Sequence, residues 1–139
     1  MRYEYLKHTA DLKVKAYGKT LEEAFANVAI GGFDFLTPTS KVQKKVEKKI
    51  SITAKRVESL LYDFLEELLF LLDTDSFMIN SFRDMKIKQE KDSFSLECTA
   101  LGDNYKNYHV KGDIKAITYS EMEIKKENDG FIVIVVLDI

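Results

Sequence analysis

The chain has 139 residues, of which 45% are hydrophobic and 32% are charged, and its formal net charge at pH 7 is −2. This length suits one domain with its own core, so we expect a single domain over residues 1–139. The near-neutral charge does not favour binding to nucleic acid or to a membrane surface, and no apolar run could cross a bilayer. The N-terminal sequence MRYEYLKHTADLKV lacks the apolar core of a secretion signal, so we expect a cytoplasmic protein.

The first elements are predicted to be two short strands, YEYLK and DLKVKAY, in which apolar and polar side chains alternate. The residues HTA between them are too few for another element and predict a turn or a bulge. TLEEAFANVAIGGFDFL then has the apolar spacing of an amphipathic helix. Gly31 and Gly32 weaken its second half, and we expect the helix to end or kink there.

KVQKKVEKKISITA, residues 41–54, is predicted to be a strand, and the interval from Lys41 to Arg56 holds seven basic residues against one acid, Glu47. A lysine-rich strand protects the edge of a sheet against aggregation. The alternative is a basic stripe that faces phosphate groups. We favour the edge strand over the stripe, which would consist of Lys44, Lys45, Lys48 and Lys49.

RVESLLYDFLEELLFLLDTD is the strongest predicted helix, because its leucines and phenylalanines recur at helical spacing. Four strand-like runs complete the chain: FMINSFRDMKIKQE, SFSLECTAL, KAITYSEMEIKK and FIVIVVLDI. The simplest arrangement is an α+β fold of two layers, with two amphipathic helices packed on one mixed or antiparallel sheet.

Few residues could carry chemistry. The two histidines are His8 and His109, and none of the common hydrolase, metalloprotease or phosphate-loop motifs occurs. His8 and Asp11 would lie on opposite faces of a strand but could converge in a turn. A hydrogen-bonded structural pair is the simpler interpretation, and a metal or catalytic site is the alternative.

A second polar group lies in YHVKGDIKAITYSEMEI, which contains His109, Lys115 and Tyr119. If this stretch is extended, Lys115, Ile117 and Tyr119 share one face. A solvated lysine and a packed tyrosine are ordinary surface features, so these residues alone do not indicate a reaction.

The chain ends on the apolar run of GFIVIVVLDI, with Asp138 beside the carboxylate of Ile139. Like charges ~4 Å apart repel by about 1 kcal/mol in water and about 4 kcal/mol near a protein surface. If a third acid lies nearby, the cluster needs donors or a cation, and oxygen ligands favour calcium or magnesium. The residues alone do not identify a third acid.

Both faces of this last strand are apolar. We expect one face to lie under the helices, while loops of the same chain or a second copy in a homo-oligomer cover the other.

Four blocks together resemble the archease family, whose members assist the GTP-dependent RNA ligase of tRNA splicing. The blocks follow the family's order and spacing over essentially the whole chain: HTADLKV, LLYDFLEELLFLLDTD, IKAITYSEMEI and VVLDI. The resemblance implies that Asp11 and Asp138 together bind a divalent cation, with the Ile139 carboxylate as a further ligand. We expect calcium first, with magnesium or manganese as alternatives.

The resemblance also implies that His8, His109, Lys115 and Tyr119 belong to a supporting or ligase-contact surface, without an assigned role. One departure from the family is visible, because Ser120 stands where many relatives have a histidine. Any role of that histidine is therefore not carried over to this chain.

The function implied is that of a non-enzymatic activator, which promotes guanylylation of the ligase and its repeated turnover. It would meet RNA only through the ligase. Two alternatives follow from the residues. One is a metal-dependent hydrolase that uses Asp11 and Asp138, with His8 as general base. The other is an RNA adaptor that uses the basic segment 41–56.

Overall fold

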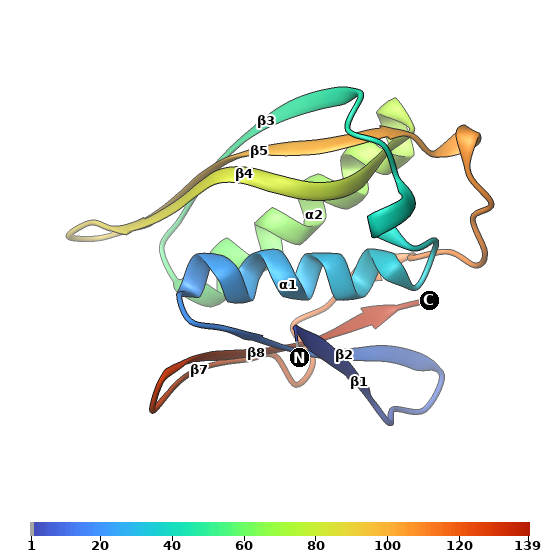
Figure 1. Cartoon of the computed structure of the whole chain (residues 1–139). Coiled ribbons are helices and arrows are strands. Elements are labelled where there is room, and N and C mark those ends of the chain that lie inside the picture. Colours follow the sequence, from blue (N-terminus) through green and yellow to red (C-terminus); the bar gives the residue numbers. More distant parts are fainter. Residues whose placement is uncertain (1) are drawn as a thin grey trace.

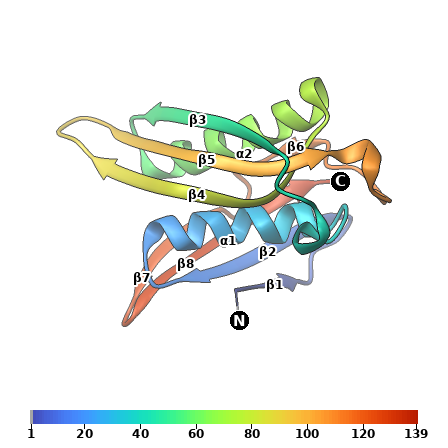
Figure 2. The same ribbon diagram turned by 45° about the horizontal axis from the view of Figure 1, so that its top comes forward.

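The computed structural model describes residues 2–139, and Met1 lies outside the described residues. Two helices lie between two antiparallel sheets (Figures 1 and 2). The helices are α1 (Leu21–Asp34) and α2 (Val57–Asp75). The five-stranded sheet contains β1 (Tyr3–Leu6), β2 (Asp11–Gly18), β6 (Ala116–Ile117), β7 (Glu123–Glu127) and β8 (Gly130–Asp138). The three-stranded sheet has the order β3 (Val46–Ala54), β5 (Phe94–Asn104), β4 (Phe77–Gln89).

The α+β class and the two helices confirm the sequence prediction, but the strands form two sheets where the sequence suggested one. The burial of α1 explains the difference, since every residue from Asn27 to Phe33 is buried. A run of consecutive buried residues covers every side of a helix, so α1 needs packing neighbours on both of its sides. α1 contacts β2 and β8 on one side and β4 on the other.

The two glycines do not end α1, which continues to Asp34, so the helix end expected there is wrong, while the alternative of a kink stays a prediction. They allow the five-stranded sheet to approach closely. A Cβ on Gly31 would lie 2.8 Å from the Tyr3 ring and from Val14, and one on Gly32 would lie 2.9 Å from Leu137. The backbone of α1 therefore packs directly on strands β1, β2 and β8.

β8 is the central strand of the five-stranded sheet, with β2 along one edge and both β6 and β7 along the other. Val133, Val135 and Leu137 face the common core, as expected for the side under the helices. On the opposite face Ile134 and Val136 are only 8% and 1% exposed. The chain itself therefore covers this second apolar face. The homo-oligomer stays a prediction.

The run KAITYSEMEIKK is not one strand, because a turn separates β6 from β7. Glu121 in this turn has a left-handed backbone, with φ 52°. Lys115 and Tyr119 are exposed while Ile117 is buried, so the three do not share the face expected of an extended stretch. The turn brings Glu121 toward the β1–β2 end of the sheet.

β3 is an edge strand of the three-stranded sheet, as the lysine-rich sequence predicted. It begins only at Val46, because the chain before it forms a short 3-10 turn at Thr39–Lys41 and a loop. Among the residues that the structure describes, no helix is both long and apolar enough to span a membrane.

Candidate functional site

The two predicted acids, Asp11 and Asp138, face each other directly. Asp11 opens β2 and Asp138 closes β8, and they are partners in the antiparallel register of these strands. Directly opposed residues lie on the same face of a sheet, with Cβ atoms roughly 4.5–5.5 Å apart. The register therefore puts two carboxylates side by side on the outer face, away from α1.

The end of β8 is held in place from its other edge as well. Asp138 is also the register partner of Ala116 in β6. The Lys115 backbone N–H donates a hydrogen bond of 2.7 Å to the Asp138 carbonyl. The Asp138 side chain is exposed and has no hydrogen bond or ion pair with any of residues 2–139. A carboxylate on a fixed backbone with no partner is free to bind something else.

His8 and Asp11 converge, as the turn interpretation of HTAD predicted. His8 lies in the turn between β1 and β2, where Ala10 adopts a left-handed backbone with φ 61°. The turn folds the imidazole back until its Nδ1 lies 3.4 Å from an Asp11 oxygen. This Nδ1 is buried and has no hydrogen-bond partner among the described residues.

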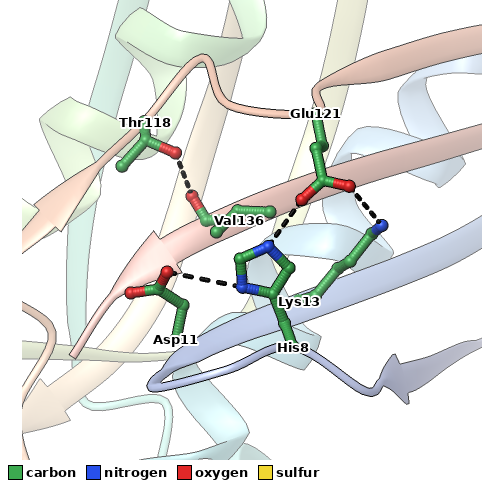
Figure 3. A network of polar contacts seen from close by, with 6 residues as sticks. All are labelled: His8, Asp11, Lys13, Thr118, Glu121 and Val136. Carbon is green, nitrogen blue, oxygen red and sulfur yellow. Dashed lines mark hydrogen bonds and ion pairs between the residues drawn. The ribbon is translucent and has the colours of Figure 1, made fainter.

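Glu121 completes the group, and sequence reasoning missed it. One of its carboxylate oxygens lies 2.5 Å from His8 Nε2, and the other accepts a hydrogen bond of 3.1 Å from Lys13 Nζ (Figure 3). The Lys13 hydrogen bond and then the His8 contact hold the pKa of Glu121 below its usual range. Glu121 is 113 residues from His8, so no local spacing could indicate the pair.

The acids fit a hard cation that keeps much of its water. Among residues 2–139, no three side chains of His, Cys, Asp or Glu form a group that could hold a metal ion. A structural zinc site, which needs four nitrogen or sulfur ligands, is thus not formed here. Two adjacent carboxylates with water completing the shell suit magnesium, and further oxygen ligands would suit calcium.

The other predicted residues differ in the contacts that they make. The Tyr119 ring stacks on Tyr62 of α2, with centroids 4.3 Å apart and planes 8° apart. Lys115 adjoins Asp138 through its backbone. His109 is exposed and makes no side-chain hydrogen bond or ion pair within residues 2–139. Ser120 is exposed beside Glu121.

The lysines of segment 41–56 do not form one stripe. Lys44 and Lys45 precede β3, and Lys48 and Lys49 alternate along it, so they point to opposite faces. Lys48 pairs with Asp75 of α2 at 2.9 Å. This arrangement fits an edge strand better than a continuous phosphate-binding surface.

Comparison with known proteins gives a consistent result. Residues 3–139 match the Archease protein family (MTH1598/TM1083). The chain is 41% identical to the protein archease of Methanosarcina barkeri over 140 residues, which covers 99% of this chain and 96% of that protein. It is 40% identical to that of Pyrococcus furiosus over 131 residues, with coverage of 93% and 92%.

Solved structures agree with these sequence matches. The solution structure of Methanobacterium thermoautotrophicum protein 1598 superposes with a TM-score of 0.84 at 38% identity, over 99% of this chain and 98% of that one. A crystal structure from Thermotoga maritima, of an archease and possible chaperone, has a TM-score of 0.55 at 18% identity. It covers 100% of this chain and 98% of that one, and shares the fold. The chain belongs to the archease family.

Proposed function

We propose that this protein is a non-enzymatic, cytoplasmic activator of the GTP-dependent tRNA-splicing RNA ligase, and that it promotes guanylylation and multiple turnover of that enzyme. The observation that carries the proposal is the direct opposition of Asp11 and Asp138 in a chain of the archease family. Two like charges opposed at a rigid strand end, of which Asp138 has no partner within residues 2–139, favour a binding role over a purely structural one.

Asp11 and Asp138, with the Ile139 carboxylate, are the residues that would hold a divalent cation. Calcium is the first choice, with magnesium or manganese as alternatives. When bound, the cation supplies positive charge that can attract carboxylate or phosphate oxygens of a partner. We infer that Lys115, Tyr119 and His109 belong to the ligase-contact surface. Lys115 adjoins Asp138 through its backbone, Tyr119 stacks on Tyr62 of α2, and His109 is exposed.

Electrostatics favour docking of this acidic corner into a basic cleft such as that of an RNA ligase. Complementary charges steer association and fix the orientation of the two partners. RNA then meets the protein only through the ligase, which agrees with the absence of a continuous basic stripe on the described part of β3.

The hydrolase alternative loses support from the placement of His8. A general base needs an open nitrogen within hydrogen-bond reach of its substrate. Here Nε2 contacts Glu121, and Nδ1 is buried against Asp11. A pocket of about 360 Å³ lines the opposite end of β2 and β8, at Gly18 and Phe131, so it does not include the two aspartates.

Incorporation of labelled GMP into the cognate ligase tests the proposal. We expect this protein to accelerate the incorporation and to raise the number of ligation turnovers, while it ligates nothing alone. Asp11→Asn serves as the matched control and should lose most of the acceleration. Equal rates with and without the protein, across ranges of protein and of calcium, magnesium and manganese, would contradict the proposal.

A further inference from the structure

We propose that Glu121 is a positioning residue for the cation site: it holds His8 against Asp11 and keeps the Lys13 ammonium away from the two aspartates. The inference rests on the cation site of the proposed function, and it assigns a role to a residue outside the Asp11–Asp138 pair. Glu121 itself contacts neither aspartate, so its effect passes through His8 and Lys13.

The contacts of Glu121 bracket Asp11 along the chain. Its two oxygens contact His8, three residues before Asp11, and Lys13, two residues after it. In both contacts Glu121 is more than a hundred residues away in sequence from its partner. Figure 3 shows the His8 ring between Asp11 and Glu121, with Lys13 on the other side of the glutamate. One carboxylate therefore links the turn before Asp11 to the strand after it.

His8 limits where the Asp11 carboxylate can lie. Its Nδ1 is buried at 3.4 Å from the Asp11 oxygen and has no hydrogen-bond partner within residues 2–139. Buried polar atoms are almost always satisfied, so an exception calls for an explanation. The contact of Nε2 with Glu121 holds the ring in this position. The imidazole then occupies one side of the Asp11 carboxylate.

Lys13 is a potential competitor for the cation. It lies two residues from Asp11 on the same face of β2, opposite Val136, while Asp11 lies opposite Asp138. A flexible ammonium at this distance could neutralise the aspartates itself. The hydrogen bond to Glu121 holds the Lys13 Nζ at the glutamate carboxylate and so keeps it from the two aspartates. Loss of Glu121 would thus both release His8 and free an internal cation.

The backbone supports a specific role for this arrangement. Ala10 and Glu121 are both non-glycine residues with left-handed φ, 61° and 52°. Such conformations persist only where the surroundings hold them, and they cluster at functional sites. The turn around Glu121 is anchored by the Thr118 hydroxyl, which donates to the Val136 carbonyl at 2.7 Å, and by the Tyr119 stack on Tyr62. Both turns are therefore held where the side chains meet.

Calorimetric titration with calcium, magnesium and manganese tests the proposal on three proteins: wild type, Glu121→Gln and Glu123→Gln. Glutamine keeps the size of Glu121 but removes the charge that holds Lys13 and His8. Outer residues that orient a ligand change metal affinity about 10- to 100-fold. We expect Glu121→Gln to weaken binding at least about tenfold. Glu123, which lies in β7 and pairs with Lys125, is the matched control and should leave affinity within about twofold.

Two further variants separate positioning from simple stabilisation. Aspartate tolerates a left-handed backbone better than glutamate but is one methylene shorter. Glu121→Asp should therefore fold and melt at or above the wild-type temperature while it still binds the cation more weakly. In a His8→Ala, Lys13→Met background, Glu121→Gln should change affinity by less than about twofold, since the residues through which it acts are gone.

The outcomes distinguish this inference from the proposed function. If the wild type binds a cation and Glu121→Gln binds it equally well, Glu121 has no positioning role and the aspartate site stands. An undiminished effect of Glu121→Gln in the His8→Ala, Lys13→Met background also overturns the inference. If the wild type binds none of the three cations, both the site and the inference are wrong.

Discussion

The two sheets differ in one respect: direct register partners of like charge occur in the five-stranded sheet but not in the described strands of the three-stranded sheet. On the three-stranded sheet, opposite charges meet: Arg83 lies 2.8 Å from Glu47 across β5. On the helix-facing side of the same sheet, Lys48 of β3 pairs with Asp75 of α2 at 2.9 Å. On the five-stranded sheet, two like charges, Asp11 and Asp138, are direct register partners. Directly opposed like charges destabilise a strand pair, so this pairing opposes folding.

This contrast indicates which charged residues are candidates for a functional role. Both sheets pack on one continuous hydrophobic core, so burial of apolar side chains stabilises each of them. Paired charges on an exposed face contribute little and need no other explanation. Two like charges opposed at the end of a buried central strand have an energetic cost, and such local violations occur at functional sites, where a ligand can compensate for them. We therefore expect the five-stranded sheet to be the functional side of the molecule.

The largest expected effect compares a core leucine in each central strand. Leu96 of β5 and Leu137 of β8 are 0% and 2% exposed. Replacement of either by alanine should lower the free energy of unfolding by about 2–5 kcal/mol. Only Leu137→Ala should also weaken cation binding, because Leu137 precedes Asp138. Urea unfolding and calorimetric titration measure both quantities. Equal losses of affinity in the two variants would remove the distinction between the sheets.

Asp138→Asn is expected to act on binding and not on the fold. The amide keeps the shape of the side chain but removes one charge from the pair, so calcium affinity should fall at least about tenfold. The metal-free melting temperature should rise slightly, because repulsion with Asp11 disappears. Asp75→Asn is the control at the other sheet: Asp75 lies at the end of α2 and pairs with Lys48 of β3, so its loss should lower the melting temperature slightly and leave affinity unchanged. A lower metal-free melting temperature for Asp138→Asn would indicate that the acid is structural.

The elements with a strong local pattern could be predicted from sequence. The leucine spacing of α2, the turn at HTAD and the apolar run of β8 follow from side-chain periodicity and short-range turn chemistry. The lysines of β3 indicated an edge strand for the same reason. These features depend on neighbours a few residues away, which a sequence shows directly.

The division into two sheets and the role of Glu121 could not be predicted in this way. Alternation shows which side chains share a face but not which strand lies alongside, so one sheet and two sheets have the same pattern. Gly31 and Gly32 were interpreted as helix breakers, although they provide close contact with Tyr3 and Leu137. Glu121 meets His8 only through the tertiary fold. The Asp11–Asp138 pair came from the family resemblance and not from spacing.

Lowering the pH should reduce the free energy of unfolding through one carboxylate at each sheet, Glu121 and Glu47. The pKa of Glu121 is lowered by hydrogen bonds from Lys13 and His8, and that of Glu47 is lowered by Arg83 through a hydrogen bond and its charge. A carboxyl whose pKa is lower when folded adds stability above its unfolded pKa of 4.5, and this is lost as pH falls through the folded pKa. Glu121→Gln and Glu47→Gln should each make the loss of stability below about pH 4.5 shallower than in wild type.

Melting temperatures between about pH 7 and 2.5 measure this effect. Both side chains are about half exposed, so we expect small changes in each variant. The two variants should differ at pH 7, where only Glu121→Gln weakens cation binding. A pH profile identical to that of wild type would mean that the carboxylate concerned is unpaired in solution.

The smallest effect is expected when lysines of the basic segment 41–56 are replaced and activation of the ligase is measured. Lys44, Lys45 and Lys49 are exposed and have no ion-pair partner among residues 2–139. The triple variant Lys44→Gln, Lys45→Gln, Lys49→Gln should activate the ligase within about twofold of wild type, because exposed charges far from a contact mainly change steering. Lys115→Gln, beside Asp138, is the matched single substitution and should lower activation more.

RNA binding by the isolated protein completes this last test, because an RNA adaptor would bind RNA in the absence of the ligase. Its affinity would fall steeply between about 50 and 200 mM salt, as counterions are released from the phosphates. We expect no such binding, either by wild type or by the triple variant. Salt-dependent binding that disappears in the triple variant would move function to the three-stranded sheet. The opposed aspartates of the five-stranded sheet would then not mark the binding site.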